Sequence, residues 1–560
     1  MNVFLPQKSS DAPNPEGRKS ERSRGLRLFP FRPLLTSCLG VSAVNLLFIL
    51  VAALAPIDAQ TYVNPVIPGD FPDPSVIAVG EEYYATATTG GWAPHFPLLR
   101  STDLINWSII GAVFNEKPAW AKGDFWAPEI TTDKGRFFVY YTARRDDGKD
   151  KKGTLCVAVA IADKPAGPYT DKGPLVCQEM GSIDAFFIRD ENDKPFLVWK
   201  EDGNDRQQPT WLYAQQLDES GTRLTGKPKK MFRNTEDWEN HVVEGSNIIR
   251  RNGWFYHFYS GNACCGRSCN YALGVARSKT LLGEWEKNPA NPILAANKTW
   301  QCPGHGSIVT TADGRDFLLY HAYRKRSDAF NIGREALLDE VKFENGWVVI
   351  NNGRGPSEQA SVPFRGTKQS PLLNLSDEFN ENILAPRWSY PIFNQQTVTV
   401  ENGFLKIAPG EKQLAVEKAP EVVLAERTVS GTYTATVRIE AARLAGDESA
   451  GLSVYSWRGQ AVGISLRSGK AFSWQRERGK HQEIASTPLP QHPASVLLRV
   501  NAEGGEVFNF SVSSDEGQTW HSVGEKVITS AVEGARVALI YNGRSTTPGV
   551  RFDWFRLVTK

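Results

Sequence analysis

Five copies of one short pattern divide the sequence between residues 64 and 350. Each copy opens with a polar residue at the start of an apolar strand, continues through a turn into an aromatic strand, and adds one or two further strands. The intervals between openers are 56, 55, 60 and 61 residues, and the openers are Asp73, Glu129, Asp184, Glu244 and His305. A period of this length with three or four short strands per copy is typical of a β-propeller. The sequence therefore predicts five blades within residues 60–355; the alternative is an all-β sandwich with accidental spacing.

The first opener has an unusually rigid backbone. Asp73 lies between Pro72 and Pro74, just before the apolar run Val76–Val79. Proline fixes its own φ and keeps the preceding residue out of the helical region, so the carboxylate is held at the mouth of a strand. An isolated Asp-Pro is also ordinary turn chemistry. In a propeller, however, the first strand of each blade lines the central axis, so the five openers are expected to converge on one pocket.

The rest of the chain lacks the repeated opener. Residues 356–371 are rich in Gly, Pro and polar residues and are expected to form a linker. Short alternating strands then follow one another through residues 372–560, which favours one β-sandwich. The predicted fold class is all-β: a five-bladed β-propeller followed by a β-sandwich domain.

The N-terminal segment has the composition of an export signal. Residues 1–59 carry seven Lys/Arg and four Asp/Glu, and the basic stretch Arg18–Arg32 precedes the apolar run Val41–Ala55. We expect a secretory signal peptide over residues 1–59, cleaved before Gln60, and a secreted or periplasmic protein without membrane contact after cleavage. The alternative is an uncleaved membrane anchor. The net charge of the whole chain is only +2, which argues against a nucleic-acid partner.

An even number of cysteines follows residue 59, which favours disulfides in an exported protein. The six are Cys156, Cys177, Cys264, Cys265, Cys269 and Cys302. Cys156 and Cys177 flank a hairpin-sized segment and form a reasonable pair. The stretch Cys264–Cys269 looks like a metal knuckle, but no second pair of ligands lies at zinc spacing, so a disulfide-stapled loop is expected instead. The pairing of the last four cysteines stays open.

Three of the openers are acids with apolar neighbours, which suits glycoside hydrolysis. That reaction needs one protonated carboxyl group to assist the leaving oxygen and one ionised carboxylate. A third carboxylate beside the acid raises the pKa of the acid through like-charge repulsion. On this reasoning Glu244 is the candidate general acid, Asp73 the base that orients a water, and Asp184 the modulator of the pKa. The residues alone leave inversion and retention of configuration open.

These residues resemble glycoside hydrolase family 43. The matching motifs are Pro-Asp-Pro-Ser around Asp73, Ser-Ile-Asp-Ala-Phe around Asp184, Val-Glu-Gly-Ser around Glu244 and Gly-His-Gly-Ser around His305. The resemblance covers about residues 62–355 and implies a five-bladed propeller that acts on arabinose- and xylose-containing polysaccharides with inversion. It implies Asp73 as general base, Asp184 as pKa modulator and orienter, and Glu244 as general acid. The later motifs Ser-Asp-Glu-Phe and Gly-Leu-Ser-Val-Tyr are similar to the C-terminal concanavalin-like sandwich of some family xylosidases.

The resemblance also implies roles for residues around the three acids. His305 is expected at the funnel floor, holding a water or a calcium ion, and Arg334 is expected to reach the substrate. The alternatives are a packing histidine and a surface salt bridge. Large aromatic side chains suit sugar rings but also fill β cores; the candidates are Trp92, Trp126, Phe186 and Trp300. Two features depart from the family pattern: Ala follows Asp184 where the family often has Pro, and the cysteine loop is unfamiliar.

The leading prediction is a secreted glycosidase that cleaves α-L-arabinofuranosyl or β-D-xylosyl linkages in plant arabinan, arabinoxylan or xylan. No cofactor is required, and calcium at the funnel floor is the one candidate metal. The alternatives are a non-catalytic carbohydrate-binding propeller, an endo-arabinanase-like enzyme, and a five-bladed glycosidase or transferase acting on fructosides with retention. The sequence leaves open arabinose versus xylose, exo versus endo action, and the role of the sandwich.

Overall fold

The computed structural model describes most of the chain after the predicted signal peptide. The described residues are 60–146, 153–371, 374–394, 396–410, 421–441, 444, 446–456, 458–490, 493–530, 532–543 and 549–560. The predicted signal peptide therefore lies outside the described residues. Strands dominate, the only α-helix in the described ranges being the single turn α1 (Ala329–Ile332), which confirms the all-β class. Among these residues no helix is long and apolar enough to cross a membrane.

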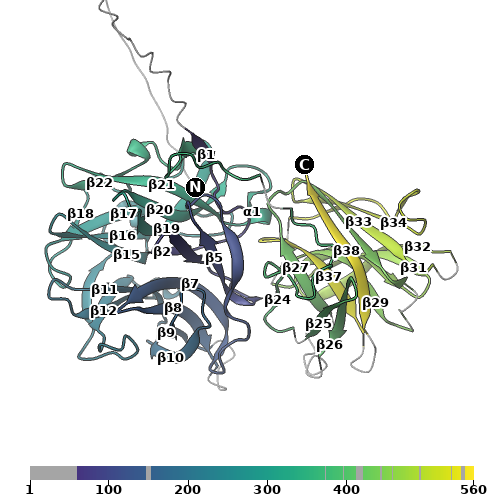
Figure 1. Cartoon of the computed structure of the whole chain (residues 1–560), viewed down its shortest axis with the longest axis horizontal. Helices are drawn as coiled ribbons and strands as arrows, with labels where there is room; N and C mark the ends of the chain where they lie inside the picture. Colours follow the sequence, from purple (N-terminus) through teal and green to yellow (C-terminus); the bar gives the residue numbers. More distant parts are fainter. Residues whose placement is uncertain are drawn as a thin grey trace, which may run out of the picture. The chain divides into compact units, whose positions relative to one another are not determined.

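Five four-stranded antiparallel sheets make up the first domain (Figure 1). Each sheet comes from one continuous stretch of sequence, and the inner strand of each neighbours the inner strand of the next, with β19 returning to β2. The sheets thus close a ring, the five-bladed propeller that the spacing predicts. From inner to outer strand, blade 1 contains β2 (Ser75–Val79), β3 (Glu82–Thr86), β5 (His95–Ser101) and β6 (Ser108–Phe114). Blade 2 contains β7 (Ala121–Asp133), β8 (Arg136–Arg145), β9 (Leu155–Ala162) and β10 (Thr170–Val176).

The remaining three blades repeat this order. Blade 3 contains β11 (Ser182–Arg189), β12 (Pro195–Glu201), β13 (Trp211–Gln216) and β14 (Lys229–Arg233). Blade 4 contains β15 (Val243–Arg251), β16 (Trp254–Gly261), β17 (Ala272–Ser278) and β18 (Glu286–Lys287). Blade 5 contains β19 (Trp300–Thr310), β20 (Asp316–Arg324), β21 (Glu335–Glu344) and β22 (Trp347–Ile350).

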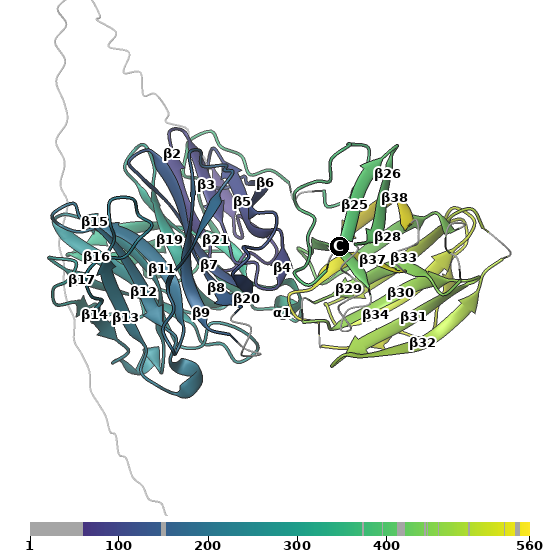
Figure 2. The ribbon, with the colours of Figure 1, turned by 90° about the horizontal axis from the view of Figure 1, so that it is seen from below.

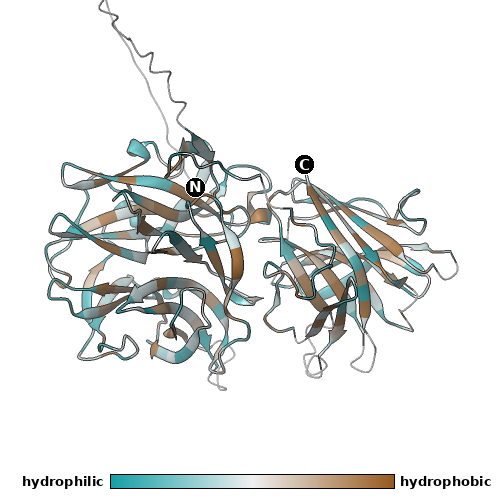
Figure 3. Ribbon diagram, viewed as in Figure 1, coloured by the Kyte–Doolittle hydropathy of each residue, from teal (hydrophilic) through white to brown (hydrophobic). Residues whose placement is uncertain are grey.

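The second strand of a blade is apolar on both faces because neighbouring blades cover it. In β8 the run Phe137–Tyr141 is almost completely buried. The ring of Phe138 stacks on that of Phe187 in blade 3, with centroids 6.4 Å apart. Figure 3 shows hydrophobic segments on strands of all parts of the fold. Such two-sided burial explains why these strands read as continuous apolar runs and not as strict alternation.

A short clasp joins the start of the propeller to the segment that follows it. Strand β1 (Thr61–Val63) pairs with β23 (Gln359–Ser361) in antiparallel register. Tyr62, the middle residue of β1, donates a hydrogen bond from its hydroxyl to the carbonyl of Leu338 in blade 5 (2.6 Å). The predicted linker 356–371 therefore contributes a strand of its own.

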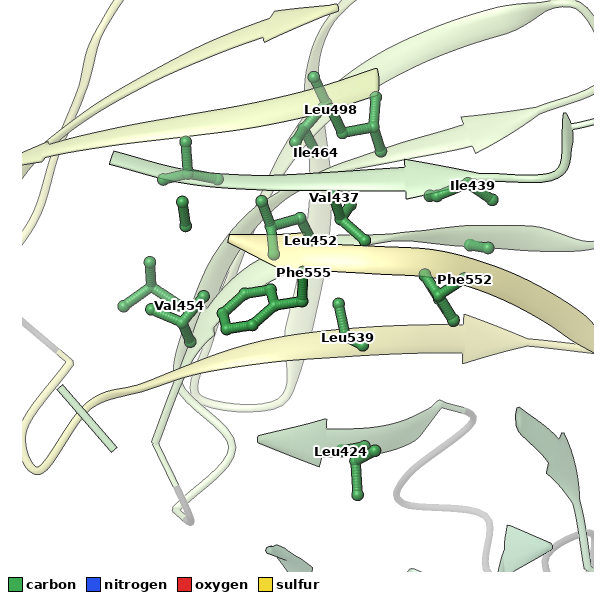
Figure 4. Close-up of a cluster of buried hydrophobic side chains, with 14 of the residues drawn as sticks. Leu424, Val437, Ile439, Leu452, Val454, Ile464, Leu498, Leu539, Phe552 and Phe555 are labelled. Atoms are coloured by element: carbon green, nitrogen blue, oxygen red, sulfur yellow. The ribbon is translucent and has the colours of Figure 1, made fainter. Parts of the chain in front are cut away.

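The second domain is a sandwich of two antiparallel sheets (Figures 1 and 2). One sheet has the order β25 (Gln396–Glu401), β26 (Phe404–Pro409), β38 (Val550–Thr559), β28 (Tyr433–Ile439), β33 (Val496–Glu503), β34 (Val507–Ser513) and β35 (His521–Ser522), with β36 (Val527–Ile528) also on β34. The other has the order β27 (Val422–Arg427), β37 (Arg536–Asn542), β29 (Ser449–Tyr455), β30 (Ala461–Arg467), β31 (Lys470–Glu477) and β32 (Lys480–Pro488). Figure 4 shows the core between them, where Leu452 and Leu539 of one sheet meet Val437 and Phe555 of the other.

The sandwich contacts three segments of the propeller. Arg427 donates from Nε to the carbonyl of Asp70 (3.1 Å), and its guanidinium lies over the ring of Phe71. The amide of Gly534 donates to the carbonyl of Phe330 in α1 (2.8 Å). A third contact is strand β24 (Tyr390–Pro391), which pairs with β4 (Trp92–Ala93). The sandwich is thus fastened to residues 70–71, to β4 and to α1.

The described part of the chain contains three disulfides, which resolve the pairing that the sequence leaves open. Cys156–Cys177 confirms the expected pair. The cysteine loop contains a bond between the adjacent residues Cys264 and Cys265, and Cys269 is bonded to Cys302 in β19. The loop is therefore stapled by disulfides, as expected.

These two disulfides of the loop should differ sharply in their effect on stability. Cys269–Cys302 spans 33 residues, so replacing both with Ala should lower the free energy of unfolding by about 4 kcal/mol through restored chain entropy. Cys264–Cys265 spans one residue, so the matched double Ala variant should change it little. Urea denaturation followed by Trp fluorescence measures both. Equal losses in the two variants would contradict this account.

Candidate active site

The opening position of every blade has the same unusual backbone. One residue in each blade adopts a left-handed φ, between 37° and 64°: Asp73, Ala127, Asp184, Gly245 and His305. In blades 2 to 5 the pairing with the second strand shifts register there. Such bulges re-aim side chains and cluster at functional sites. In blade 1 the residue lies just before β2, whose pairing with β3 has no register shift. For brevity we call all five the bulge residues.

Blade 2 departs from the prediction at this point. Its bulge is at Ala127, so Glu129 lies two residues farther along β7 and does not line the cavity described below. Glu129 instead accepts a hydrogen bond from Ser75 Oγ (2.7 Å). Burial raises its pKa to about 8. The expected convergence therefore holds for four of the five openers, and Glu129 is a structural residue between blades 1 and 2.

A ring of hydrogen bonds fixes these bulges from blade to blade. The backbone N–H of each bulge residue donates to a side chain of the preceding blade. The pairs are Ala127 to Thr88 Oγ1 (2.6 Å), Asp184 to Thr142 Oγ1 (3.2 Å), Gly245 to Asp184 Oδ2 (3.0 Å), His305 to Ser260 Oγ (2.8 Å) and Asp73 to His321 Nδ1 (3.1 Å). In four cases the acceptor lies within the last four residues of the second strand or just beyond its end.

Blade 3 breaks this pattern because Lys200 occupies that position. A lysine ammonium has no acceptor, so Asp184 satisfies the N–H of Gly245 in its place. Gly245 itself has little room for a side chain, since a Cβ would lie 2.9 Å from the ring of His305. Asp184 therefore holds the backbone that carries Glu244.

The bulges surround a cavity of about 830 Å³, a size within the usual range for ligand sites. Its floor contains the three predicted acids, each less than 10% exposed: Asp73, Asp184 and Glu244. His305, Arg334 and Trp126 also line it. The structure thus brings seven of the eight residues predicted for catalysis or substrate binding to this cavity, with Trp92 only at its edge.

Asp73 is held as an anion by the groups around it. Thr88 Oγ1 donates to Oδ2 (2.7 Å), and Arg334 Nη1 donates to Oδ1 (3.0 Å). Burial alone would raise the pKa of Asp73, but the Arg334 guanidinium and His321 outweigh it, so the pKa lies well below its usual value. An ionised, tightly oriented carboxylate is what a general base requires.

Glu244 lies beside a cation that the sequence analysis missed. Lys200 Nζ donates to Glu244 Oε2 (2.5 Å) and to Asp202 Oδ1 (3.1 Å), and the hydroxyl of Tyr271 donates to Glu244 Oε1 (2.8 Å). Burial would raise the pKa of Glu244, but Lys200 and Tyr271 outweigh it and lower the pKa. This direction is opposite to the expected effect of a neighbouring carboxylate, because Lys200 and Tyr271 act more strongly on Glu244.

Asp184 has the higher pKa of the two carboxyls, because its pKa is raised where that of Glu244 is lowered. Burial and the neighbouring Glu244 raise the pKa of Asp184 to about 6, against the opposing effect of His305. Two adjacent buried carboxyls with environments this different are typical of an acid/base site.

His305 links two of the acids. Its Nδ1 lies 3.5 Å from Asp73 Oδ1 and 3.8 Å from Asp184 Oδ2. Calcium prefers six to eight oxygen ligands, whereas His305 offers nitrogen and Asp73 is already engaged by Arg334. Within the described ranges no group of three or more His, Cys, Asp or Glu side chains could hold a metal ion. These residues do not fit calcium, and no step below uses it.

The aromatic candidates divide into one that faces the cavity and three that do not. Trp126 lines it and is half-buried. Trp92 touches its edge but is only 1% exposed, because Arg536 and Tyr455 of the sandwich cover its ring. Phe186 is buried among residues of blades 3 and 4, and Trp300 is buried in blade 5. Assigning Phe186 to the substrate is wrong, and Trp92 is an interface residue.

The residues that the sequence analysis missed share one position. Thr88, Thr142, Lys200, Ser260 and His321 recur at intervals of 54, 58, 60 and 61 residues, close to the period of the openers. Antiparallel pairing places the end of the second strand beside the start of the first. Lys200 lies opposite Ile183, for instance. Polar residues at this point of each repeat were the available signal.

The sandwich supplies part of the cavity rim. Ser456, Gln460 and Glu533 line it from two loops of that domain. The segments that the sandwich fastens, residues 70–71 and α1, lie next to Asp73 and Arg334. The second domain therefore both shapes the mouth of the cavity and braces two of its charged residues.

Comparisons with known proteins agree with this arrangement. The sequence model of glycosyl hydrolases family 43 matches residues 62–348, and that of the beta xylosidase C-terminal concanavalin A-like domain matches residues 376–558. The chain is 31% identical over 319 residues to Xylosidase/arabinosidase 43B of Humicola insolens, covering 54% of this chain and only 57% of that protein. It is 23% identical over 529 residues to the non-reducing end alpha-L-arabinofuranosidase BoGH43B of Bacteroides ovatus, covering 89% and 94%.

The fold comparison extends over both domains. The crystal structure of the GH43 BlXynB protein from Bacillus licheniformis superposes with a TM-score of 0.77 at 25% identity, covering 90% of this chain and all of that one. With a family match over more than half of its length, the chain belongs to glycosyl hydrolases family 43 and carries the concanavalin A-like domain at its C-terminal end.

Proposed function

We propose that the protein is a secreted, inverting exo-glycosidase that removes α-L-arabinofuranosyl or β-D-xylosyl units from plant cell-wall polysaccharides. The observation that supports this proposal is the floor of the cavity, where Asp73 is kept ionised. Two further carboxyls, Asp184 and Glu244, lie there and have pKa values shifted in opposite directions. The names of the Humicola and Bacteroides relatives support the two sugars, and the name of the Bacteroides relative supports attack at the non-reducing end. Three disulfides support an oxidising compartment.

In the proposed reaction a water molecule attacks the anomeric carbon through its oxygen, and Asp73 accepts the proton that this water loses. Glu244 donates its proton to the glycosidic oxygen as the bond between this oxygen and the anomeric carbon breaks. Glu244 must therefore be protonated in the complex. Substrate that displaces water from the cavity disfavours the charged form of a buried carboxyl and so raises the pKa of Glu244 towards the protonated form that donation requires. Lys200 and Tyr271 then stabilise the carboxylate that remains after proton donation.

A substrate panel tests the proposal. Purified protein is assayed on aryl α-L-arabinofuranoside, aryl β-D-xyloside, arabinan, arabinoxylan and xylan, and NMR identifies the anomer formed first. We expect turnover of at least one aryl glycoside with inversion. Binding without turnover would favour the carbohydrate-binding alternative, and a retained anomer would favour the fructoside-type alternative.

Lys200 gives a sharper prediction about pH. Its ammonium holds Glu244 in the charged form, so Lys200→Met should raise the pKa of Glu244. The alkaline limb of the kcat/KM profile, where the acid loses its proton, should then move upward by about one to three pH units. The groups that also face Glu244 are Tyr271, Asp184 and His305, and they are unchanged in this variant.

Lys200→Arg is the matched control because it keeps the positive charge, and its alkaline limb should stay near that of the wild type. An unmoved limb in Lys200→Met, with normal thermal stability, would show that Lys200 does not act on the catalytic acid.

A further inference from the structure

The loop between β16 and β17 forms a wall of the cavity that the mechanism does not use. Cys264, Cys265 and Gly266 of this loop all line the cavity. Cys265 is exposed, whereas the three acids at the floor are buried. The adjacent-residue disulfide therefore lies towards the mouth of the cavity and the acids at its bottom.

The bond between Cys264 and Cys265 does little that a disulfide usually does. A disulfide stabilises a protein mainly by shortening loops of the unfolded chain, and a bond between neighbours closes no such loop. The same loop already has a staple in Cys269–Cys302, which ties it to β19. What remains for Cys264–Cys265 is local shape and chemistry: two sulfurs held in one small ring, polarizable and without S–H donors.

This wall is fixed from two sides. The amide of Gly266 donates to the hydroxyl of Tyr323 in β20 (3.4 Å). Arg267 contacts the sandwich, with Nη2 3.3 Å from Glu506 Oε1 and 3.3 Å from the carbonyl of Ser530, and its guanidinium lies over the ring of Phe330. Ser530 lines the cavity as well. The disulfide and the sandwich segment beside it thus form one continuous rim.

We propose that the Cys264–Cys265 disulfide is a specificity-determining contact for the leaving-group sugar of an oligosaccharide substrate. This rests on the proposed function: a terminal sugar bound at the buried acids leaves the rest of the chain directed outward past the rim. The apolar face of the disulfide then packs against the C–H face of the next sugar ring. The polar side chains of the sandwich rim form hydrogen bonds with the hydroxyl groups of that ring.

The test compares substrates with and without a leaving-group sugar. The full-length Cys264→Ala/Cys265→Ala variant and the wild type are assayed on a glycosyl fluoride, whose leaving group is a single atom, and on an oligosaccharide with the same terminal sugar. We expect kcat/KM for the oligosaccharide to fall by about tenfold, chiefly through KM, the lower end of what one apolar contact contributes to specificity. Activity on the fluoride should stay within about twofold of the wild type, because its leaving group does not reach the rim.

Cys156→Ala/Cys177→Ala is the matched control, since it also removes one disulfide but neither residue lines the cavity. In this control variant kcat/KM should change by the same factor for the fluoride and for the oligosaccharide. If the first variant loses both activities equally, or neither, the proposal is overturned while the glycosidase assignment stands. If the wild type hydrolyses neither substrate for arabinose or xylose, the proposed function itself fails and this inference with it.

Discussion

Asp73→Asn should lower kcat/KM by about 10²–10⁴-fold on every substrate, including those with excellent leaving groups. The amide cannot accept the proton of the attacking water, and a better leaving group does not replace that step. Asn tolerates a left-handed φ, so the bulge at position 73 and its hydrogen bond to His321 are expected to persist. Steady-state kinetics on a glycosyl fluoride and on an oligosaccharide measure the loss.

Glu129→Gln is the matched control for this substitution. Glu129 is also an acid of an inner strand and is partly buried, but it lies outside the cavity, and its pKa of about 8 makes it mostly neutral at pH 7. Gln copies that neutral form and its hydrogen bond from Ser75. Activity should stay within a few-fold of the wild type. A strong loss here, or a mild one in Asp73→Asn, would remove the basis for naming Asp73 as the base.

Glu244→Gln should show the second large effect, but one that depends on the leaving group. On an oligosaccharide, whose departing oxygen needs a proton, kcat/KM should fall by about 10²–10⁴-fold. On a dinitrophenyl glycoside, whose leaving group departs as an anion, most of the activity should return. The Gln oxygen can still accept the hydrogen bond of Lys200, and the amide NH2 can donate to the Tyr271 hydroxyl instead of accepting from it. A thermal melt checks that the variant is folded.

Asp184→Asn separates the two members of the carboxyl pair. If Asp184 acts by positioning residues 244–245, its loss should reduce activity on both substrates alike, without recovery on the activated one. Recovery in Asp184→Asn but not in Glu244→Gln would make Asp184 the acid. That outcome would agree with the raised pKa of Asp184 in the unliganded site and would exchange the two roles.

The period of the sequence was enough to predict the blades and the three acids, because a repeated strand opener leaves a mark at a fixed interval. It failed at Glu129, since spacing alone cannot tell a bulge residue from one two positions beyond it. The shift places Ala127 at the bulge and removes Glu129 from the cavity. A residue two positions beyond the bulge lies farther along β7, away from the cavity, and no composition signal distinguishes the two positions.

The roles of Lys200 and the aromatic residues could not be predicted for a different reason: they depend on contacts between distant segments. Lys200 reaches Glu244 across 44 residues of sequence, and its charge reverses the pKa shift that like-charge repulsion alone predicts. Trp92 has the residue type of a sugar platform, but the sandwich covers it. Neither burial by another domain nor a single cation at a strand end is visible in a local pattern.

The clasp between β1 and β23 bears on how this protein can be dissected. A catalytic fragment that ends at residue 355 would leave β1 without its partner strand and β4 without β24. Unpaired edges invite association with other chains, and Phe71 and Trp92 would lose the arginines that cover them. The two domains are therefore poorly suited to separation. A chimera that exchanges the propeller between relatives should keep residues 61–361 intact and include the sandwich of the same protein.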